Sequence, residues 1–189
     1  MRTAAAEVTP ADAMRTGIAG LWLLRTKSVT DERGTVREFF RSSEFVALGV
    51  PLPNRWSQMN MTWSRHGVVR GLHGEVTTKL VGVASGTALG VFLDARKDSP
   101  TYGVVVTAPL EVGSTALVPP GVCNGFQVTS LEGCQYVYCF DEEWSPGMPG
   151  IAVRPTDPAL GIDWPVPICE ADPASISHKD ATAPLLADL

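Results

Sequence analysis

The chain has 189 residues, of which 44% are hydrophobic and 19% charged. This composition fits one globular domain and excludes a disordered chain. The formal net charge is -5, so there is no basic excess for binding nucleic acid, although a local cationic pocket for a phosphorylated small molecule is still allowed. The sequence contains no recognisable signal peptide and no apolar run as long as a membrane span, so we expect a cytoplasmic protein with reduced thiols.

Short β-type runs, separated by turns rich in glycine, proline and aspartate, dominate the chain. We expect residues 1–16 to form a flexible N-terminal tail and residues 17–189 a single domain. Strand-like runs lie at 21–26, 35–40, 57–63, 67–72, 79–84, 87–95, 103–108, 115–118, 125–130 and 134–140. One helix is expected at 41–50, capped by Ser42 or Ser43 and ended by Gly49 and Pro51.

The regular spacing of these strands and the near absence of helix predict an all-β fold, either a closed antiparallel barrel or a jelly roll. Polar residues alternate with apolar ones in some strands, for example Gln58 and Asn60. Such residues face either the solvent or an internal ligand cavity, and periodicity leaves both readings open. The four cysteines lack CxxC spacing, so no zinc site is expected; all except Cys169 lie in apolar runs that predict buried free thiols.

The stretch RGLHGEVTTK places His73 after a strand-like run and Lys79 six residues later. A metal-binding jelly roll of the cupin kind needs a second histidine two residues after the first and another in a later strand. Those positions hold Glu75 and Asn124, the latter after the turn VPPG. We therefore expect no metal at His73.

Several stretches, in order, resemble the dTDP-4-dehydrorhamnose 3,5-epimerase family of nucleotide-sugar epimerases. They are DERG, SQMNMTWSRHGVVRGLH, KLVGVASG, VFLDARKDSPTYG, VPPGVCNGF, YVYCFDEEWSPG, DPALGIDWP and SHKD, and the resemblance covers roughly residues 20–184. It implies a cupin-type antiparallel jelly-roll barrel with few short helices, no metal and no cofactor. It also implies a nucleotide-diphospho-sugar substrate and a homodimer paired through swapped N-terminal strands, a role that LWLLRT and TVREFF would suit.

The resemblance implies a catalytic role for each of four residues. A 4-keto sugar has acidic C–H bonds at C3 and C5, because deprotonation gives an enolate on the C4 oxygen. The histidine of the RGLH motif is the base in the family, and His73 matches it. Lys79 matches the lysine that stabilises the enolate, and Asp180 in SHKD the aspartate that orients the base. Tyr138 matches the tyrosine that reprotonates the far face, with Tyr136 as a competitor on the same side of the strand.

The resemblance also implies a set of substrate-binding residues. Arg33 and Arg70 match arginines that grip the diphosphate, a role suited to forked guanidinium groups. The other candidates are Lys179 at the diphosphate, Gln58 and Asn60 at the sugar end, Glu38 near the nucleotide, Trp144 in place of a sugar-packing tyrosine, and Asn124 in place of a second histidine.

Two departures bear on the substrate. The interval from His73 to Lys79 lacks the Pro-rich loop of rhamnose-pathway members, and Asn124 replaces a histidine. Both features resemble members that act on GDP-linked 6-deoxy-4-keto-heptoses. We predict epimerisation at C3, C5 or both of a 4-keto-6-deoxy sugar linked to dTDP or GDP. Two alternatives are a nucleotide-sugar 3,4-ketoisomerase and a non-catalytic sugar-nucleotide binding barrel, although a binder would need no acid–base pair.

Overall fold

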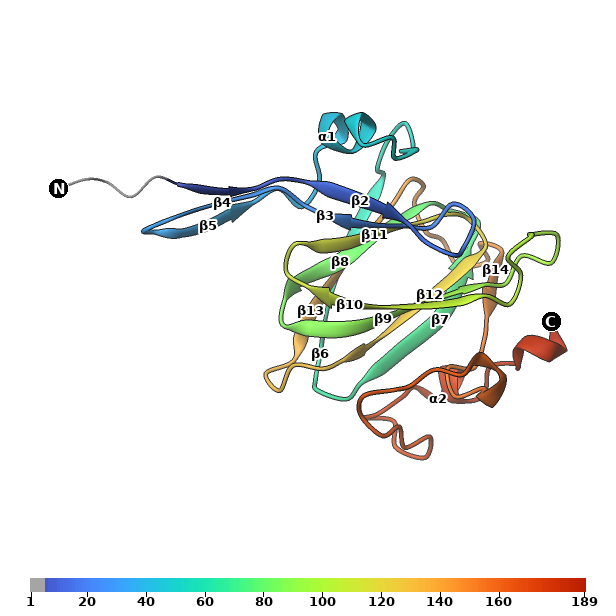
Figure 1. The fold of residues 1–189 in the computed structure, drawn as a ribbon. Coiled ribbons are helices and arrows are strands. Elements are labelled where there is room, and N and C mark those ends of the chain that lie inside the picture. Colours follow the sequence, from blue (N-terminus) through green and yellow to red (C-terminus); the bar gives the residue numbers. More distant parts are fainter. Residues whose placement is uncertain (1–5) are drawn as a thin grey trace.

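The computed structural model describes residues 6–189, which fold into two antiparallel sheets packed face to face with a smaller third sheet projecting from them (Figure 1). The predicted all-β antiparallel fold is confirmed, since these residues contain fourteen strands and only two short α-helices. No helix of the described residues is both long and apolar enough to span a membrane.

The two main sheets form the barrel. In spatial order the six-stranded sheet contains β2 (Asp12–Arg15), β3 (Trp22–Arg25), β11 (Ser114–Val118), β8 (Lys79–Ser85), β13 (Cys134–Phe140) and β6 (Gln58–Ser64). The five-stranded sheet contains β10 (Val105–Glu111), β9 (Thr87–Asp94), β12 (Val122–Val128), β7 (Val69–Glu75) and β14 (Gly150–Ala152). The third sheet contains β1 (Glu7–Thr9), β4 (Ser28–Asp31) and β5 (Gly34–Arg37).

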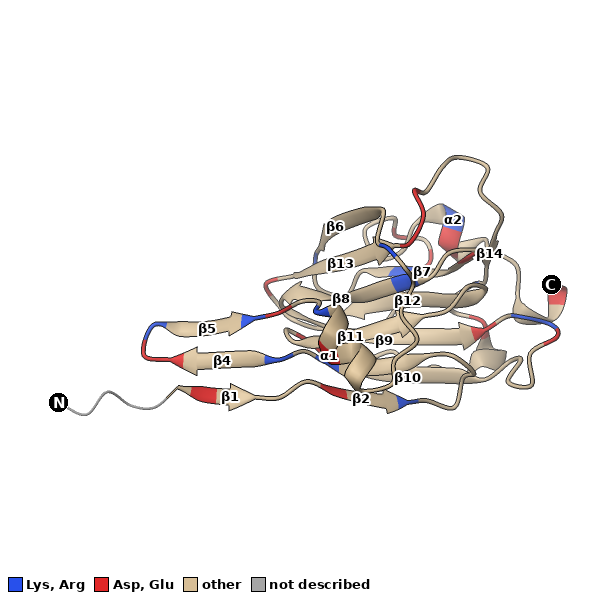
Figure 2. Cartoon of the chain, turned by 90° about the horizontal axis from the view of Figure 1, so that it is seen from above, with Lys and Arg blue, Asp and Glu red and all other residues tan. Residues whose placement is uncertain are grey.

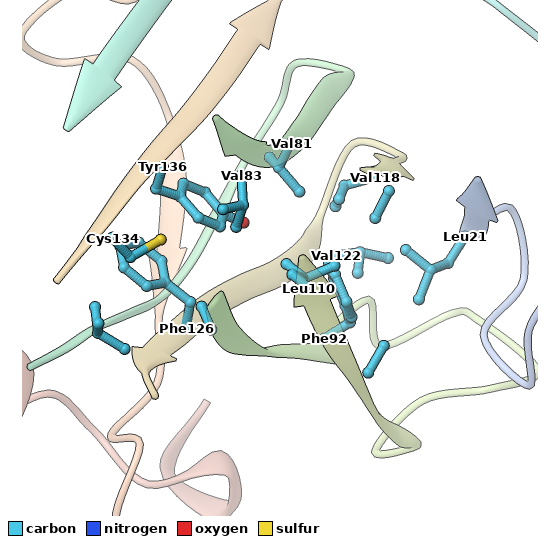
Figure 3. Close-up of a cluster of buried hydrophobic side chains, with 14 of the residues drawn as sticks. Leu21, Val81, Val83, Phe92, Leu110, Val118, Val122, Phe126, Cys134 and Tyr136 are labelled. Carbon is cyan, nitrogen blue, oxygen red and sulfur yellow. The ribbon is translucent and has the colours of Figure 1, made fainter. Parts of the chain in front are cut away.

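The main core lies between the two large sheets (Figure 3). Because side chains alternate along a strand, each sheet sends every second residue inward, and these residues are mostly branched or aromatic. Phe126 of β12 stacks on Tyr136 of β13, with ring centroids 4.0 Å apart. This contact joins the sheets beside the cavity described below. As expected, Cys123, Cys134 and Cys139 are buried free thiols.

A second apolar cluster covers the outer face of the six-stranded sheet, where α1 (Ser42–Ala47) packs through Phe45. The predicted serine cap of this helix is wrong. Arg41 is the N-cap residue, with an extended backbone and no side-chain hydrogen bond, because the helix starts at Ser42 itself. The predicted end is confirmed, since Gly49 adopts the left-handed conformation just after the helix.

The expected N-terminal tail is instead built into the sheets over the residues that the structure describes. β1 pairs with β4 and β2 pairs with β3, while residues 1–5 lie outside the described part. Such short strands, containing alanine, aspartate and glutamate, have weak β propensity, so their pairing with β3 and β4 stabilises them. The predicted strand 35–40 is also shorter, because β5 ends at Arg37 and Phe39 and Phe40 turn onto the second cluster.

The sheet β1-β4-β5 forms an arm that extends from one end of the barrel (Figure 1). The arm carries both acidic and basic residues (Figure 2). Val8, Val29 and Val36 lie directly opposite one another across its three strands, and Val8 and Val36 are 55% and 73% exposed. The arm therefore presents a row of apolar residues that its own chain leaves largely uncovered.

The C-terminal segment returns to the five-stranded sheet and brings α2 (His178–Ala181) over β7. Leu72 and Val153 exchange backbone hydrogen bonds of 3.2 and 3.0 Å, and Val69 N donates to Ser175 O at 2.8 Å. The fully buried Gln127 bonds both the backbone nitrogen and the backbone oxygen of Val166. These bonds fix residues far along the chain next to the strand that carries His73.

Candidate active site

A cavity of about 990 Å³ opens between the two sheets and beneath the C-terminal segment. Its volume is at the upper end of the range for small-molecule sites. Most of the residues predicted for the site line it: His73, Lys79, Tyr138, Asp180, Asn60, Arg70, Asn124, Trp144 and Lys179. Polar side chains of the strands thus face an internal cavity here, which answers the question that periodicity left open.

His73 and Asp180 form a polar contact between distant parts of the cavity wall. His73 Nε2 lies 2.7 Å from Asp180 Oδ1, although 107 residues separate the two in the chain. The Asp180 side chain is 7% exposed and that of His73 37%, so the imidazole reaches the cavity in front of a buried carboxylate. A carboxylate on one ring nitrogen fixes the tautomer and orients the ring.

The position and charge of Asp180 are set by its neighbours. Ser177 caps α2 by accepting a hydrogen bond from Asp180 N, and Gly71 N donates to Asp180 Oδ2 at 3.4 Å. Burial raises the pKa of Asp180, but the hydrogen bonds with His73, Ser177 and Gly71 outweigh it and hold that pKa below its ordinary value. Asp180 is therefore a carboxylate at neutral pH.

Lys79 is the first residue of β8 and its side chain is only 4% exposed. Its Nζ donates to the backbone oxygen of His73 at 3.1 Å and forms an ion pair with Glu75. The ammonium therefore lies within hydrogen-bonding distance of the backbone of the residue predicted to be the base. A buried ammonium beside the reacting carbonyl can stabilise developing negative charge on its oxygen.

Asn124 lies directly opposite His73, on β12. The pairing of β12 with β7 is irregular at this point, because the register shifts between Asn124 and Phe126. Gly71 and Gly125 meet here: a Cβ on Gly71 would lie 2.6 Å from the Gly125 Cα, and Gly71 has a φ of +116°. Irregular pairing of this kind redirects side chains next to functional sites.

The two tyrosines of β13 have different environments. Tyr138 is partly buried, and its hydroxyl lies 3.2 Å from Thr62 Oγ1. Tyr136 is 1% exposed, stacks on Phe126, and has a pKa raised by burial. The hydroxyl of Tyr138 is thus the more accessible proton donor, which favours it over its competitor.

Three further cationic side chains line the cavity. Arg70 and Lys179 are exposed there, and Arg70 Nε donates to Ser64 Oγ at 2.9 Å. Arg65 also lines the cavity and was missed by the sequence analysis, because nothing in its motif distinguished it from an ordinary surface arginine. Together the three residues provide a cationic site suited to an anionic diphosphate.

Three predicted site residues do not line the cavity of the described chain. Arg33 is on the β4–β5 turn of the arm, with a 90% exposed side chain paired to Asp31. Glu38 follows the arm and pairs with Arg41. Gln58 instead contacts two residues that line the cavity: it donates to Asn60 Oδ1 at 3.1 Å and accepts from Trp144 N at 2.8 Å.

Glu75 is a further cavity residue whose role the sequence analysis did not assign. Its spacing of four residues from Lys79 was visible, but only the folded interval between the strands brings their charges into contact. Within residues 6–189, no group of three or more histidine, cysteine, aspartate or glutamate side chains is arranged to hold a metal ion.

Comparison with known proteins identifies the family of the chain. A model of the dTDP-4-dehydrorhamnose 3,5-epimerase family matches residues 15–188. The enzyme of that name from Salmonella typhimurium is 35% identical over 179 residues, which cover 92% of this chain and 94% of the relative.

Two solved structures with bound nucleotide sugars are also similar. RmlC from Streptococcus suis in complex with dTDP-D-xylose has a TM-score of 0.84 at 30% identity and covers 95% of this chain and 93% of its own. RmlC from Legionella pneumophila in complex with dTDP-4-keto-L-rhamnose has a TM-score of 0.82 at 32% identity and covers 94% and 93%. The chain therefore belongs to the dTDP-4-dehydrorhamnose 3,5-epimerase family and is an isomerase of the nucleotide-sugar epimerase class.

Proposed function

We propose that this chain epimerises a nucleotide-linked 4-keto-6-deoxy sugar at C3, C5 or both, with His73 as base and Tyr138 as acid. The observation that carries the assignment is the His73–Asp180 contact of 2.7 Å at the wall of a cavity that also contains Lys79 and Tyr138. A base, a cation for the oxyanion and a proton donor are the groups that epimerisation beside a ketone requires.

Proton abstraction is the first step of the proposed mechanism. The Asp180 carboxylate accepts a hydrogen bond from the Nε2–H of His73, which leaves the unprotonated Nδ1 to take the proton from C3 or C5. The electron pair of the C–H bond moves into the ring and the C4 oxygen becomes an enolate. The imidazolium that forms is stabilised by the ionised Asp180 carboxylate.

Lys79 and Asn124 are placed to act on the enolate oxygen. The Lys79 ammonium uses one N–H on the His73 carbonyl and one on Glu75, so a third is available for a substrate oxygen. Asn124, opposite His73 on the neighbouring strand, can donate an amide N–H but cannot carry a charge. We therefore assign most of the charge stabilisation to Lys79.

Reprotonation from the opposite face completes the inversion. Tyr138 belongs to the six-stranded sheet and His73 to the five-stranded sheet, so the two project into the cavity from opposing walls. The Tyr138 hydroxyl gives its proton to the carbon as the enolate returns to the ketone. Exchange with water then restores the phenol and the neutral imidazole.

We assign Arg65, Arg70 and Lys179 to the diphosphate and Asn60 and Trp144 to the sugar. The nucleotide is dTDP or GDP: the ligands of the two similar structures are dTDP sugars, whereas the short interval between His73 and Lys79 resembles GDP-heptose epimerases. A pocket of about 990 Å³ can hold a complete nucleotide sugar.

We also propose a homodimer in which the arm reaches the partner copy. Of the two N-terminal runs expected to pair with a second copy, Trp22–Arg25 is incorporated into the chain's own sheet, between β2 and β11. The arm instead exposes Val8 and Val36, and an exposed apolar row of this kind is typical of an interaction surface. Arg33 at the arm's tip would then contribute to the diphosphate site of the partner subunit.

A panel of 4-keto-6-deoxy hexoses and heptoses on dTDP, GDP and CDP tests this function. Products identified by NMR should be inverted at C3, C5 or both, with the ketone still at C4. Migration of the ketone to C3 would instead indicate a ketoisomerase. Binding of all sugars without any exchange of C3 or C5 protons would indicate a non-catalytic barrel.

A further inference from the structure

We propose that Glu75 is a positioning residue that keeps Lys79 in its ammonium form and directs it toward the reaction centre. This inference rests on the proposed function, because it concerns the cation assigned to the enolate oxygen.

Glu75 and Lys79 both line the cavity next to His73. Glu75 ends β7 and Lys79 begins β8. The Lys79 side chain is 4% exposed and that of Glu75 18%, so the ion pair is largely shielded from water. Shielding makes the pairing stronger and less sensitive to salt than a contact at the surface.

The short interval between the strands fixes the pair. Thr78 N donates to Asp141 Oδ1 at 3.0 Å, and Asp141 N donates to Thr78 O at 3.2 Å. At the other end of the interval, Gly121 N donates to Glu75 O at 2.8 Å. With both ends of the interval bonded to neighbouring segments, Glu75 is restricted to the vicinity of Lys79.

The other charged and titratable groups around Lys79 do not replace Glu75. His73 on β7 is paired with Asp180. Burial raises the pKa of Cys123 on β12 to about 12, so its thiol is neutral. Asp141, after β13, accepts from Thr78 N, and Asp94 at the end of β9 pairs with Arg96.

The Tyr138 hydroxyl on β13 lies 3.2 Å from Thr62 Oγ1. Among the described acidic residues, Glu75 is the one that forms an ion pair with Lys79. It is therefore the counter-ion of this buried ammonium.

A counter-ion matters because a buried ammonium loses its proton readily when it stands alone. A neutral amine in place of Lys79 could still donate a hydrogen bond, but it could not balance the charge of an enolate. The Glu75 carboxylate accepts a hydrogen bond from one N–H of Lys79, and the His73 carbonyl accepts from a second. These two bonds fix the direction of the third Lys79 N–H, which is available for the substrate.

The test compares Glu75→Gln and Glu75→Asp with the wild type, and uses Glu132→Gln as a matched control. Glu132 is exposed on the β12–β13 turn, outside the cavity, so its substitution makes the same charge change elsewhere. The first measurement is the pH dependence of kcat for C3 and C5 proton exchange. In Glu75→Gln the alkaline limb should move to lower pH by about one to three units, because an opposite charge in contact is worth that much.

KM should change little in Glu75→Gln, and Glu75→Asp should recover part of the rate. Glu132→Gln should keep the wild-type profile. A wild-type pH profile and rate in Glu75→Gln would overturn the proposal.

A second measurement does not depend on activity. The Lys79 side chain, labelled with ¹³C and ¹⁵N and assigned with Lys79→Arg, is titrated by NMR in the resting protein. Neutralisation of Lys79 at lower pH in folded Glu75→Gln than in wild type would support the proposal, and identical titrations would overturn it. This result stands even if no 4-keto sugar is turned over, so failure of the proposed function and failure of this inference are distinguishable.

Discussion

At the scale of single residues, the proposed chemistry depends on contacts that connect distant parts of the chain. The sequence marked His73, Lys79, Tyr138 and Asp180 only through their resemblance to family motifs, since each residue alone has an ordinary structural explanation. The structure places all four at one cavity. Periodicity could not predict the His73–Asp180 contact, because 107 residues separate its members and the C-terminal segment has no regular pattern.

The role of Tyr138 as acid predicts a separation of proton abstraction from inversion. In Tyr138→Phe, His73 can still remove and return a proton on its own face, so exchange with deuterated solvent should continue. Inversion should fall roughly 100-fold, the lower end of the usual contribution of an acid–base group. NMR of the product in D₂O measures both quantities in one reaction.

Tyr102→Phe is the matched control for this prediction. Tyr102 lies on the loop between β9 and β10, away from the cavity lining, and its hydroxyl is 3.5 Å from Leu186 O. Its loss should leave both quantities at the wild-type value. Unchanged inversion in Tyr138→Phe would remove this tyrosine from the acid role.

At the level of elements, hydrophobic patterning predicted the long strands with alternating apolar residues and missed several of the shortest strands. β13 was expected at 134–140 and lies there, because its alternating aromatic and aliphatic residues belong to the core. β1, β2, β4 and β14 have three or four residues each, too few for a clear hydrophobic pattern, and pairing with other strands decides their conformation. The register of β7 on β12 could not be predicted either, because it depends on a local irregularity.

That irregularity predicts a strong effect of Gly71→Ala. The new Cβ would come within 2.6 Å of Gly125 Cα at a φ of +116°, so β7 would have to move away from β12. The free energy of unfolding should fall by about 1–3 kcal/mol, as for other overpacked sites. The displacement should also separate His73 from Asp180, and activity should fall more than stability explains.

Chemical denaturation and kcat of the folded variant measure these two effects. Gly147→Ala provides a control, because no atom lies within 4 Å of a Cβ added there. Gly147 also has a positive φ and lines the cavity, so this control reports on backbone strain without a steric clash. Wild-type activity and stability in Gly71→Ala would contradict the close approach of the two strands.

At the scale of the whole molecule, the arm is the feature that one chain does not explain. It extends from the barrel with exposed valines, and it carries Arg33 away from the cavity of its own chain. The sequence predicted Arg33 as a diphosphate ligand through its DERG motif, but it could not indicate which copy of the cavity the residue serves.

Mixed dimers test whether the arm acts on the partner. Arg33→Ala alone should raise KM about 10- to 100-fold, the value of one or two hydrogen bonds to a charged group, and His73→Asn alone should be inactive. If the arm acts on the partner, a mixed dimer contains one cavity with both intact residues. Co-refolding the two variants should then give mixed dimers in which one of the two sites has the wild-type KM.

Activity no higher than that of Arg33→Ala alone would show that the arm does not serve the partner. Analytical ultracentrifugation on the same samples verifies that mixed dimers form. A monomeric wild-type protein would contradict the proposed homodimer directly.

Deuterium incorporation from D₂O at C3 and C5 of a 4-keto-6-deoxy nucleotide sugar is the decisive measurement of whether His73 is the base. The wild type should exchange at one or both carbons, because we propose that His73, in contact with Asp180, removes those protons. In folded His73→Asn the exchange rate should fall by roughly 100-fold or more. Exchange at the wild-type rate in this variant would contradict the assignment of His73 as the base.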